Sequence, residues 1–517
     1  MLQFYFQRDK YKILRRDLII NIVYLSIMIS KKFLKSSLIY STVGALPVLS
    51  GFVLLFFYTG GILSTKTYGY LTLHLSFTLL FQSFISFCLE SFIGPVIFES
   101  KDKPAELKLK IANINYYSLL FSFLTIFLFS IIGPFIFEFS FKDALPMQFY
   151  PFVFCSLITA FFNAYFKLYS NYLIYTEQPN QFLISNIVNF IATIVISLIG
   201  LYSFGDSIMG PLMGRLLSGL IIFLIAFVFM QKQFGAKSNS VFFTDIKKFC
   251  IPLLVYSVLN WVFNYADRIF IEKALTTDLV GLFDFGIKCT LGIEIIFSGM
   301  NNSVYPKIYS LIKENASAEK LKENINKYAS GYLIVVILSI IFTLITVPIA
   351  VHFLIKTAYY HKALAFLGIL AVGQIFKVLY YIYLAPLFYY KRTGLVAKSF
   401  VFITIVQLTF TAVLMYYFKF NGIIIAYLIS KPFQILFVYI ESKKFIKIPI
   451  IVMKQIVLPI VLCTFVLVLQ VLIKDNEVLY YNPILGLLML LITAIFYRNE
   501  INPFYKQFIK AKLLKHA

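Results

Sequence analysis

The chain has 517 residues, of which 60% are hydrophobic and 13% are charged, whereas soluble domains contain about 45–50% and about 25%. Its mean hydropathy of +0.85 excludes a water-soluble globule and predicts an all-α integral membrane protein with many helices. The 46 basic and 23 acidic residues give a net charge of +23, which in a soluble protein would suggest a nucleic-acid partner. In a membrane protein, the basic residues must first be assigned to one side of the bilayer.

A helix needs roughly 20 apolar residues to cross the hydrocarbon core. The sequence contains about 14 such segments, joined by mostly short connections, and no connection is long enough to form a separate domain. The predicted spans are residues 36–58, 69–97, 111–137, 150–174, 182–202, 210–230, 249–271, 280–304, 329–355, 363–389, 395–418, 421–440, 455–473 and 482–497.

Lysine and arginine are concentrated in every second connection. The segments on the side of the N-terminus hold 32 of the 46 basic residues, the opposite loops hold 7, and 7 lie within spans. Because short cytoplasmic loops carry the excess of Lys and Arg, both termini are predicted to be cytoplasmic. The net charge is therefore interpreted as a property of the cytoplasmic face, and no nucleic-acid partner is predicted.

Residues 1–35 are predicted to be a cytoplasmic segment. Their apolar stretch, Asp17–Ile29, is too short to span and is not followed by the small-residue cleavage site of a signal peptide. An interfacial helix is one interpretation. The alternative is that Met28 is the true start of the protein.

The five cysteines lie at least 39 residues apart, all in apolar stretches. This spacing excludes a CxxC motif and predicts buried thiols without structural disulfides. Neither a metal nor a cofactor is predicted.

Two short motifs indicate an internal repeat. Leu63–Gly69 and Leu275–Gly281 share the pattern L-[ST]-T-x-x-x-G at an offset of 212 residues, and each is the first outer loop of a six-span block. Gly214-Arg215 and Ser430-Lys431 place a small residue before a cation at an offset of 216. Repeats of the same orientation predict two six-helix bundles with a substrate site between them. The predicted division is 1–35, a first bundle at 36–232, a second at 233–445, two additional transmembrane helices at 446–497 and a cytoplasmic tail at 498–517.

The segment at 249–272 resembles a hallmark of polysaccharide-type flippases of the multidrug/oligosaccharidyl-lipid/polysaccharide exporter superfamily. It contains Ile251-Pro252-Leu253 near its inner end and Asp267-Arg268 near its outer end, and Val280–Phe283 follows. The opening Ser37–Tyr40 is similar to the start of that family's first hairpin, and the resemblance continues over the chain from residue 36.

This resemblance implies a non-enzymatic flippase that moves undecaprenyl-diphosphate-linked oligosaccharides across a bacterial inner membrane by alternating access. The glycan would be a unit of O-antigen, capsule or exopolysaccharide. The partners implied are that lipid-linked oligosaccharide, membrane lipids, and a polysaccharide polymerase with other assembly proteins.

Charged residues inside the spans are the candidate functional residues. A cation at mid-helix costs about 2.5–3.5 kcal/mol on insertion scales, so such residues normally face a bundle interior or water. They predict a hydrated, positively lined cavity suited to a diphosphate. The candidate diphosphate ligands are Arg215, Lys431, Lys377, Arg268, Lys288 and Lys167. The candidates for ion coupling are Glu90, Asp267, Asp284 and Glu294.

Structural roles compete with these assignments. Asp284 and Lys288 have the spacing of an intrahelical ion pair. Asp267 and Arg268 are adjacent, so they cannot share a helix face. Lys398, near the inner end of its span, is expected to snorkel to the interface rather than line the cavity.

Two other functions compete with the flippase. A cation-coupled multidrug exporter of the same superfamily is the nearest, but the first span lacks an acidic residue and the spans hold 7 basic against 4 acidic residues. A membrane polysaccharide polymerase is less favoured, because the outer loops are short and no loop carries a catalytic constellation. An ATP-driven pump is disfavoured because there is no phosphate-binding loop motif.

The loop charges generate a topological prediction. Tags in the region 307–327 should be cytoplasmic, and tags near Lys66 and Lys273 should be external, because 32 basic residues lie on one side and 7 on the other. Labelling of single cysteines in intact cells measures this. Labelling near Lys320 by a membrane-impermeant reagent would reverse the predicted orientation.

Overall fold

The computed structural model describes residues 43–498, apart from 45, 101, 142–143, 315–316, 391, 449–452 and 473–477. The segment 1–35, the opening Ser37–Tyr40 and the tail from residue 499 onward therefore lie outside the described residues. Every described element is a helix, which confirms the all-α prediction. The first nine are α3 (Leu46–Phe57), α4 (Thr65–Ser86), α5 (Leu89–Glu99), α6 (Pro104–Ser140), α7 (Phe154–Tyr175), α8 (Pro179–Phe204), α9 (Met209–Gln233), α10 (Ser240–Ala274) and α11 (Thr277–Cys289). The others are α12 (Leu291–Lys313), α13 (Ala318–Leu354), α14 (Leu364–Val372), α15 (Lys377–Tyr389), α16 (Thr393–Ser442), α17 (Leu458–Leu472) and α18 (Val478–Phe496), with short 3₁₀ and π turns beside several of them.

Polar side chains set where several long helices begin. Ser64 caps α4 by accepting a hydrogen bond from the backbone N–H of Thr67, and Ser317 does the same for Lys320 in α13. Asn239 accepts from two backbone N–H groups at the start of α10. Each cap satisfies donors that the first turn of a helix leaves unpaired.

Eight described helices are long and apolar enough to span a membrane, or nine if the bent pair α4–α5 counts as one span. Helices α3, α17 and α18 are apolar but shorter. Helix α16 covers two of the predicted spans, 395–418 and 421–440. Its backbone leaves the right-handed helical region at Lys419, where φ is +51°, and this break lies between the two spans. Each predicted span thus has a helical counterpart, while the count of 14 stays a prediction.

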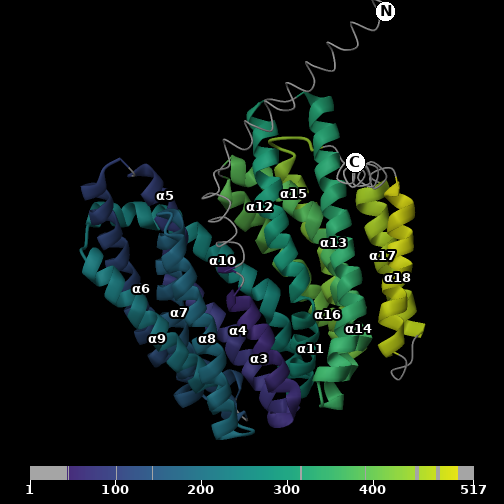
Figure 1. Cartoon of the computed structure of the whole chain (residues 1–517), viewed down its shortest axis with the longest axis horizontal. Coiled ribbons are helices and arrows are strands. Elements are labelled where there is room, and N and C mark those ends of the chain that lie inside the picture. The colour runs from purple at the N-terminus through teal and green to yellow at the C-terminus, as the bar shows by residue number, and fades with distance from the viewer. Residues whose placement is uncertain are drawn as a thin grey trace, which may run out of the picture.

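The helices form two groups. In Figure 1, α5–α9 lie on one side and α12–α18 on the other, with α3, α4 and α10 between them. Helix α10 contributes to both hydrophobic cores: Phe242 and Ile246 pack with the core of α5, α6, α7 and α9, whereas Trp261 and Ile271 pack in a larger core to which helices of both groups contribute. The predicted division at residues 232 and 233 into two six-helix bundles remains a proposal.

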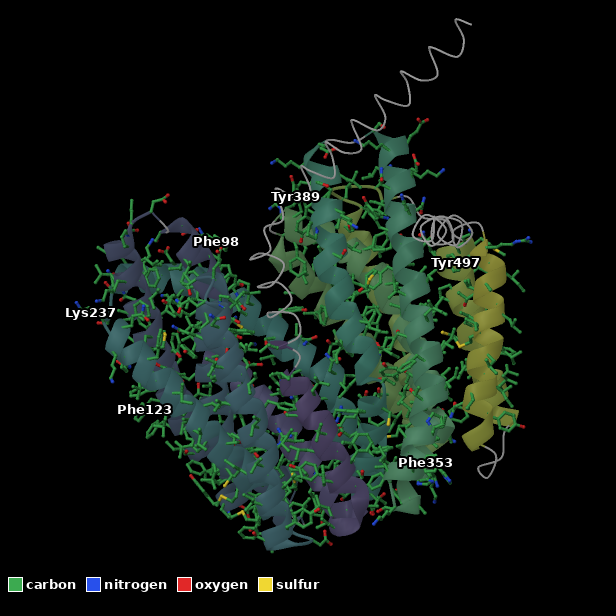
Figure 2. The ribbon with its side chains drawn as sticks, viewed as in Figure 1. Phe98, Phe123, Lys237, Phe353, Tyr389 and Tyr497 are labelled. Carbon is green, nitrogen blue, oxygen red and sulfur yellow. The ribbon has the colours of Figure 1, made fainter. Side chains whose placement is uncertain are left out.

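The connections between successive helices alternate between two ends of the molecule. Figure 2 places Phe98, Lys237, Tyr389 and Tyr497, which adjoin connections predicted to be cytoplasmic, towards one end, and Phe353 near the other. This arrangement matches the predicted alternation of loops. The groups of helices spread apart towards the first end and meet near the second, around α3 and α11 (Figure 1).

The two repeat motifs pack against each other at the end where the groups meet. A Cβ on Gly69 would overlap the carbonyl oxygen of Thr277, and a Cβ on Gly281 would lie 3.1 Å from the carbonyl oxygen of Thr65. These contacts are reciprocal, because an offset of 212 relates Thr65 to Thr277 and Gly69 to Gly281. The Thr65 hydroxyl also donates to Asp278. We call this contact between the starts of α4 and α11 the glycine contact.

All five cysteines are buried and free. Their burial confirms the prediction of buried thiols.

Gly69→Ala should weaken the glycine contact, because its Cβ has no room beside the Thr277 carbonyl. Overpacking of this kind costs about 1–3 kcal/mol, which should lower the melting temperature of the protein in detergent. The matched control is Gly292→Ala in α12, where nothing lies within 4 Å of the added atom. Equal melting temperatures for the two variants would contradict the proposed role of Gly69.

Candidate functional site

Asp284 joins three helices in the centre of the molecule. It accepts hydrogen bonds from Arg268 of α10 at 3.0 Å (Nε) and 2.7 Å (Nη2), both to its Oδ1. Its Oδ2 lies 2.7 Å from Nζ of Lys288, one turn along α11, and accepts from the hydroxyl of Tyr68 of α4 at 3.2 Å. Lys288 in turn donates to the Tyr68 oxygen at 3.2 Å. We call these four residues the Asp284 cluster.

The cluster bears on two sequence expectations. The Asp284–Lys288 pair forms as its spacing suggested. Arg268, predicted as a diphosphate ligand, is only 3% exposed and is held by Asp284 instead. Its neighbour Asp267 points elsewhere and accepts from Gln407 and Thr411 of α16 at 3.1 and 3.0 Å, as expected for adjacent residues on different helix faces.

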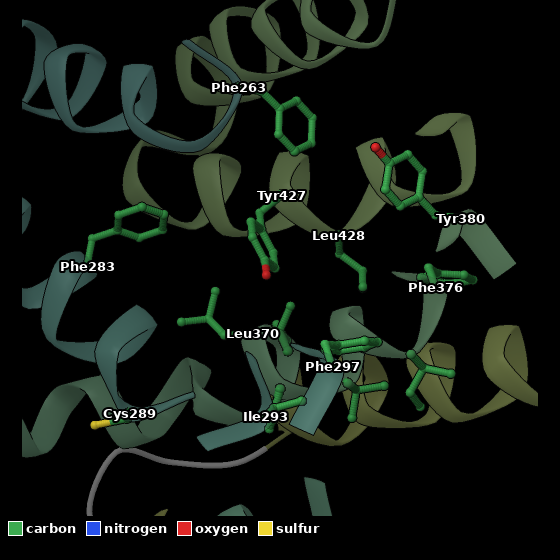
Figure 3. Close-up of a cluster of buried hydrophobic side chains, with 14 of the residues drawn as sticks. Phe263, Phe283, Cys289, Ile293, Phe297, Leu370, Phe376, Tyr380, Tyr427 and Leu428 are labelled. Carbon is green, nitrogen blue, oxygen red and sulfur yellow. The ribbon is translucent and has the colours of Figure 1, made fainter. Parts of the chain in front are cut away.

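A second set of charges lines a small cavity of about 70 Å³ among α10, α11, α12, α15 and α16. Lys377 forms an ion pair there with Glu294. Lys431 is 2% exposed and lies over two aromatic rings, 4.7 Å from the centre of Phe263 and 4.3 Å from that of Tyr427. Figure 3 shows Phe263, Phe283 and Tyr427 around the same space. We call this the Lys431 cavity.

Arg215 lies in α9, on the other group of helices. Gly214, its neighbour, packs against the backbone of Ser197 in α8, and the Arg215 side chain is half-buried. Buried polar atoms of Tyr58, Ser197 and Arg215 (Oη, Oγ and Nε) make no hydrogen bond of good geometry with any described residue, although the Tyr58 hydroxyl lies beside the other two. The guanidinium is also close enough to Lys288 for the two positive charges to repel.

A larger cavity of about 250 Å³ lies between α4, α5 and α7 on one side and α10 on the other. Lys167 donates to Oε1 of Glu90 at 3.0 Å in this cavity, and its side chain is 52% exposed. The other carboxylate oxygen of Glu90 has no partner among the described residues. We call this the interlobe cavity.

The structure brings most of the predicted charged residues together in ion pairs, some across different helices and some within one helix. Five of the seven intramembrane cations lie within 4.0 Å of a carboxylate: Lys167, Arg268, Lys288, Lys377 and Lys398. Lys398 is 55% exposed and faces Glu441 at 3.5 Å. Within the described ranges, Arg215 and Lys431 alone among the seven make no ion pair. These two do not share a cavity here, because Arg215 is absent from the lining of the Lys431 cavity.

Sequence reasoning missed three residues of these sites. Tyr68 lies inside the repeat motif, which could have drawn attention to it. Trp261 is the single tryptophan of the chain and lines the interlobe cavity. Gln407, which donates a hydrogen bond to Asp267, had no distinguishing sequence signal.

No group of three or more His, Cys, Asp or Glu residues among those described could hold a metal ion.

Comparison with known sequences gives two matches. Residues 33–311, more than half of the chain, match the family described as polysaccharide biosynthesis protein. An Lsg locus protein of Haemophilus influenzae is 24% identical over 251 residues, which are 45% of this chain and 59% of that relative. The alignment therefore spans well under two thirds of the relative's length.

Comparison with solved structures confirms a transporter fold. The lipid II flippase MurJ in an inward closed conformation has a TM-score of 0.64 at 14% identity, over 90% of this chain and 100% of that one. An inward-facing multidrug resistance MATE transporter has a TM-score of 0.60 at 15% identity, over 79% and 96% of the two chains. An outward-facing MATE transporter gives 0.51 at 14% identity, over 80% and 96%.

Asp284→Asn should destabilise the protein strongly, because it leaves Arg268 and Lys288 buried with no full counter-charge. Removing one member of a buried ion pair costs about 3–5 kcal/mol, which thermal unfolding in detergent should show. Glu106→Gln is the matched control: Glu106 pairs with Lys103 and Lys110 on the surface and should be replaceable without a measurable change. Equal stabilities of the two variants would show that the Asp284 cluster does not hold the helices together.

Proposed function

The chain belongs to the polysaccharide biosynthesis protein family, and we propose that it is a flippase for undecaprenyl-diphosphate-linked oligosaccharide. It would move a unit of O-antigen, capsule or exopolysaccharide from the cytoplasmic to the outer leaflet of the bacterial inner membrane, with both termini in the cytoplasm. It would work without catalysis and would deliver its cargo to a polysaccharide polymerase and other assembly proteins.

The observation that carries this proposal is the pair of unneutralised cations. Arg215 and Lys431 have no carboxylate within 4.0 Å among the described residues, whereas the other five intramembrane cations do. An unpaired cation in a span costs about 2.5–3.5 kcal/mol, a cost that an anionic ligand removes. A diphosphate has the charge and the acceptor oxygens that guanidinium and ammonium groups bind best.

The charge pairing also weighs against a cation-coupled multidrug exporter. A site for cationic drugs needs a carboxylate with spare negative charge. Asp284 is shared by two cations, Glu294 pairs with Lys377, and Glu90 pairs with Lys167. Asp267 accepts hydrogen bonds from the neutral side chains of Gln407 and Thr411, and its negative charge shares a cavity with the positive charge of Lys431. The balance of the described charges therefore favours an anionic substrate.

Alternating access is the mechanism we propose, with the two predicted bundles rocking about the central charges. The glycine contact closes the end predicted to be external, and the helix groups spread apart towards the end predicted to be cytoplasmic. This arrangement suits an inward-facing state that loads substrate from the cytoplasmic leaflet. The better fit to the inward-facing than to the outward-facing MATE structure is in line with it.

Arg215→Ala and Lys431→Ala should each reduce glycan export. A charge-assisted hydrogen bond is worth about 1.5–3 kcal/mol, so each loss should weaken transport roughly tenfold to hundredfold. Arg215→Lys should be milder, because the charge stays while the forked geometry is lost. The measurement is complementation of a flippase-null strain, with the membrane abundance of each variant quantified.

Lys398→Ala is the matched control, because this lysine is half-exposed and lies beside Glu441 at the helix end. It should support normal export. Full export by the Arg215→Ala, Lys431→Ala double variant at normal abundance would rule out these cations as the diphosphate site.

A further inference from the structure

We propose that the interlobe cavity binds the sugar part of the substrate, separately from the cations that receive the diphosphate. This inference rests on the proposed function and adds to it a recognition site for neutral carbohydrate. The cavity has a volume of about 250 Å³ and lies between α10 and the helices α4, α5 and α7. The residues that carry the argument are Gln82, Ser83, Glu90, Lys167, Asn260 and Trp261.

The polar groups of this cavity are those that bind hydroxyls. Gln82 and Ser83 come from α4, and Asn260 comes from α10 on the opposite side of the cavity. Gln82 makes no side-chain hydrogen bond within the described part of the chain. The amide oxygen of Asn260 accepts from Asn264 at 3.1 Å, which leaves its amide hydrogens for a ligand. Amides both donate and accept, as vicinal sugar hydroxyls require.

The charge of the cavity is balanced, which distinguishes it from an anion site. Glu90 accepts from Lys167 at 3.0 Å through one oxygen, and its second oxygen is buried without a partner among the described residues. A free carboxylate oxygen accepts hydrogen bonds from hydroxyl groups and repels phosphate. The cavity therefore favours a neutral, hydroxyl-rich ligand over a diphosphate.

Trp261 gives the cavity a fixed aromatic surface. Its indole N–H donates to the backbone oxygen of Ser76 in α4 at 2.6 Å, so the ring is anchored between α10 and α4. The ring of Tyr265, one turn along α10, lies nearly parallel to it, 6.3 Å away at 25°. Trp261 is 8% exposed, so it presents only an edge of its ring to the cavity, but rings held rigidly in this way contact the C–H face of a sugar at little entropic cost.

Photo-crosslinking in cells tests the sugar site with whatever glycan the cell supplies. A small diazirine amino acid replaces Gln82 or Asn260 in the cavity, Leu216 beside Arg215, or Phe123, which is 66% exposed on α6. After irradiation, the purified protein is treated with mild acid, which hydrolyses the bond between sugar and diphosphate, and the adducts are weighed by mass spectrometry. An adduct on the sugar then keeps the glycan and loses the prenyl chain, whereas an adduct on the lipid does the opposite.

We expect positions 82 and 260 to retain glycan after acid, and position 123 to carry membrane lipid without glycan. Prenyl chain retained at positions 82 and 260 would overturn the sugar site. Substrate adducts at position 216 with none at 82 and 260 would overturn it as well while leaving the flippase intact. Adducts that carry neither glycan nor undecaprenyl at every position would overturn the proposed function itself.

A substitution gives an independent readout. Asn260→Leu should reduce glycan export several-fold, because it removes hydrogen bonds to the sugar at nearly constant volume. The matched control is Asn324→Leu on the exposed part of α13, where the amide bonds only to its own helix. Equal export by the two variants at equal abundance would contradict sugar binding by Asn260.

Discussion

The requirement that a charge buried among apolar helices must be neutralised organises this protein. Asp284 meets that requirement for two cations at once, and the hydroxyl of Tyr68 completes its shell of donors. The three helices that contribute, α4, α10 and α11, are also those through which the two groups of helices touch. The ion cluster therefore fixes the relative position of the three helices. Moving any one of them would leave a charge without its partner in a medium of low dielectric constant.

The glycine contact lies beside that cluster on the same two helices, α4 and α11. Gly69 directly follows Tyr68, and Gly281 lies one turn before Asp284. Both lack the Cβ atoms that would hold the backbones apart, so Tyr68 can approach Asp284 closely enough to donate. Close backbone packing and charge neutralisation thus depend on each other. The reciprocal pattern of the two repeat motifs explains why a small residue is needed at both positions and not at one alone.

Features set by residues close together in the sequence could be predicted, whereas contacts between residues far apart in the sequence could not. Spans, loop alternation and the repeat are local or periodic patterns, and they led to the correct fold class. The Asp284–Lys288 pair was also predictable, because its partners lie one turn apart on one helix. The Lys377–Glu294 pair was not, since its residues are 83 positions apart and meet only through packing of α12 against α15. Likewise, nothing in the composition indicated that Arg268 would be held by Asp284 rather than face a cavity. The span count and the limits of the two bundles remain predictions.

The placement of the two unpaired cations bears on how binding could drive transport. Arg215 belongs to the first predicted bundle and lies close to Lys288 of the second, so positive charges repel across the boundary between them. Lys431 lies deep in the second bundle and shares no cavity with Arg215. A ligand shifts a conformational equilibrium only when it binds the two states with different free energies. Coulomb interactions weaken with distance, so an anion near Arg215 and Lys288 would interact with both cations most strongly while the bundles are close. Its binding energy therefore depends on the relative position of the bundles, which is the physical condition for coupling between substrate binding and their motion.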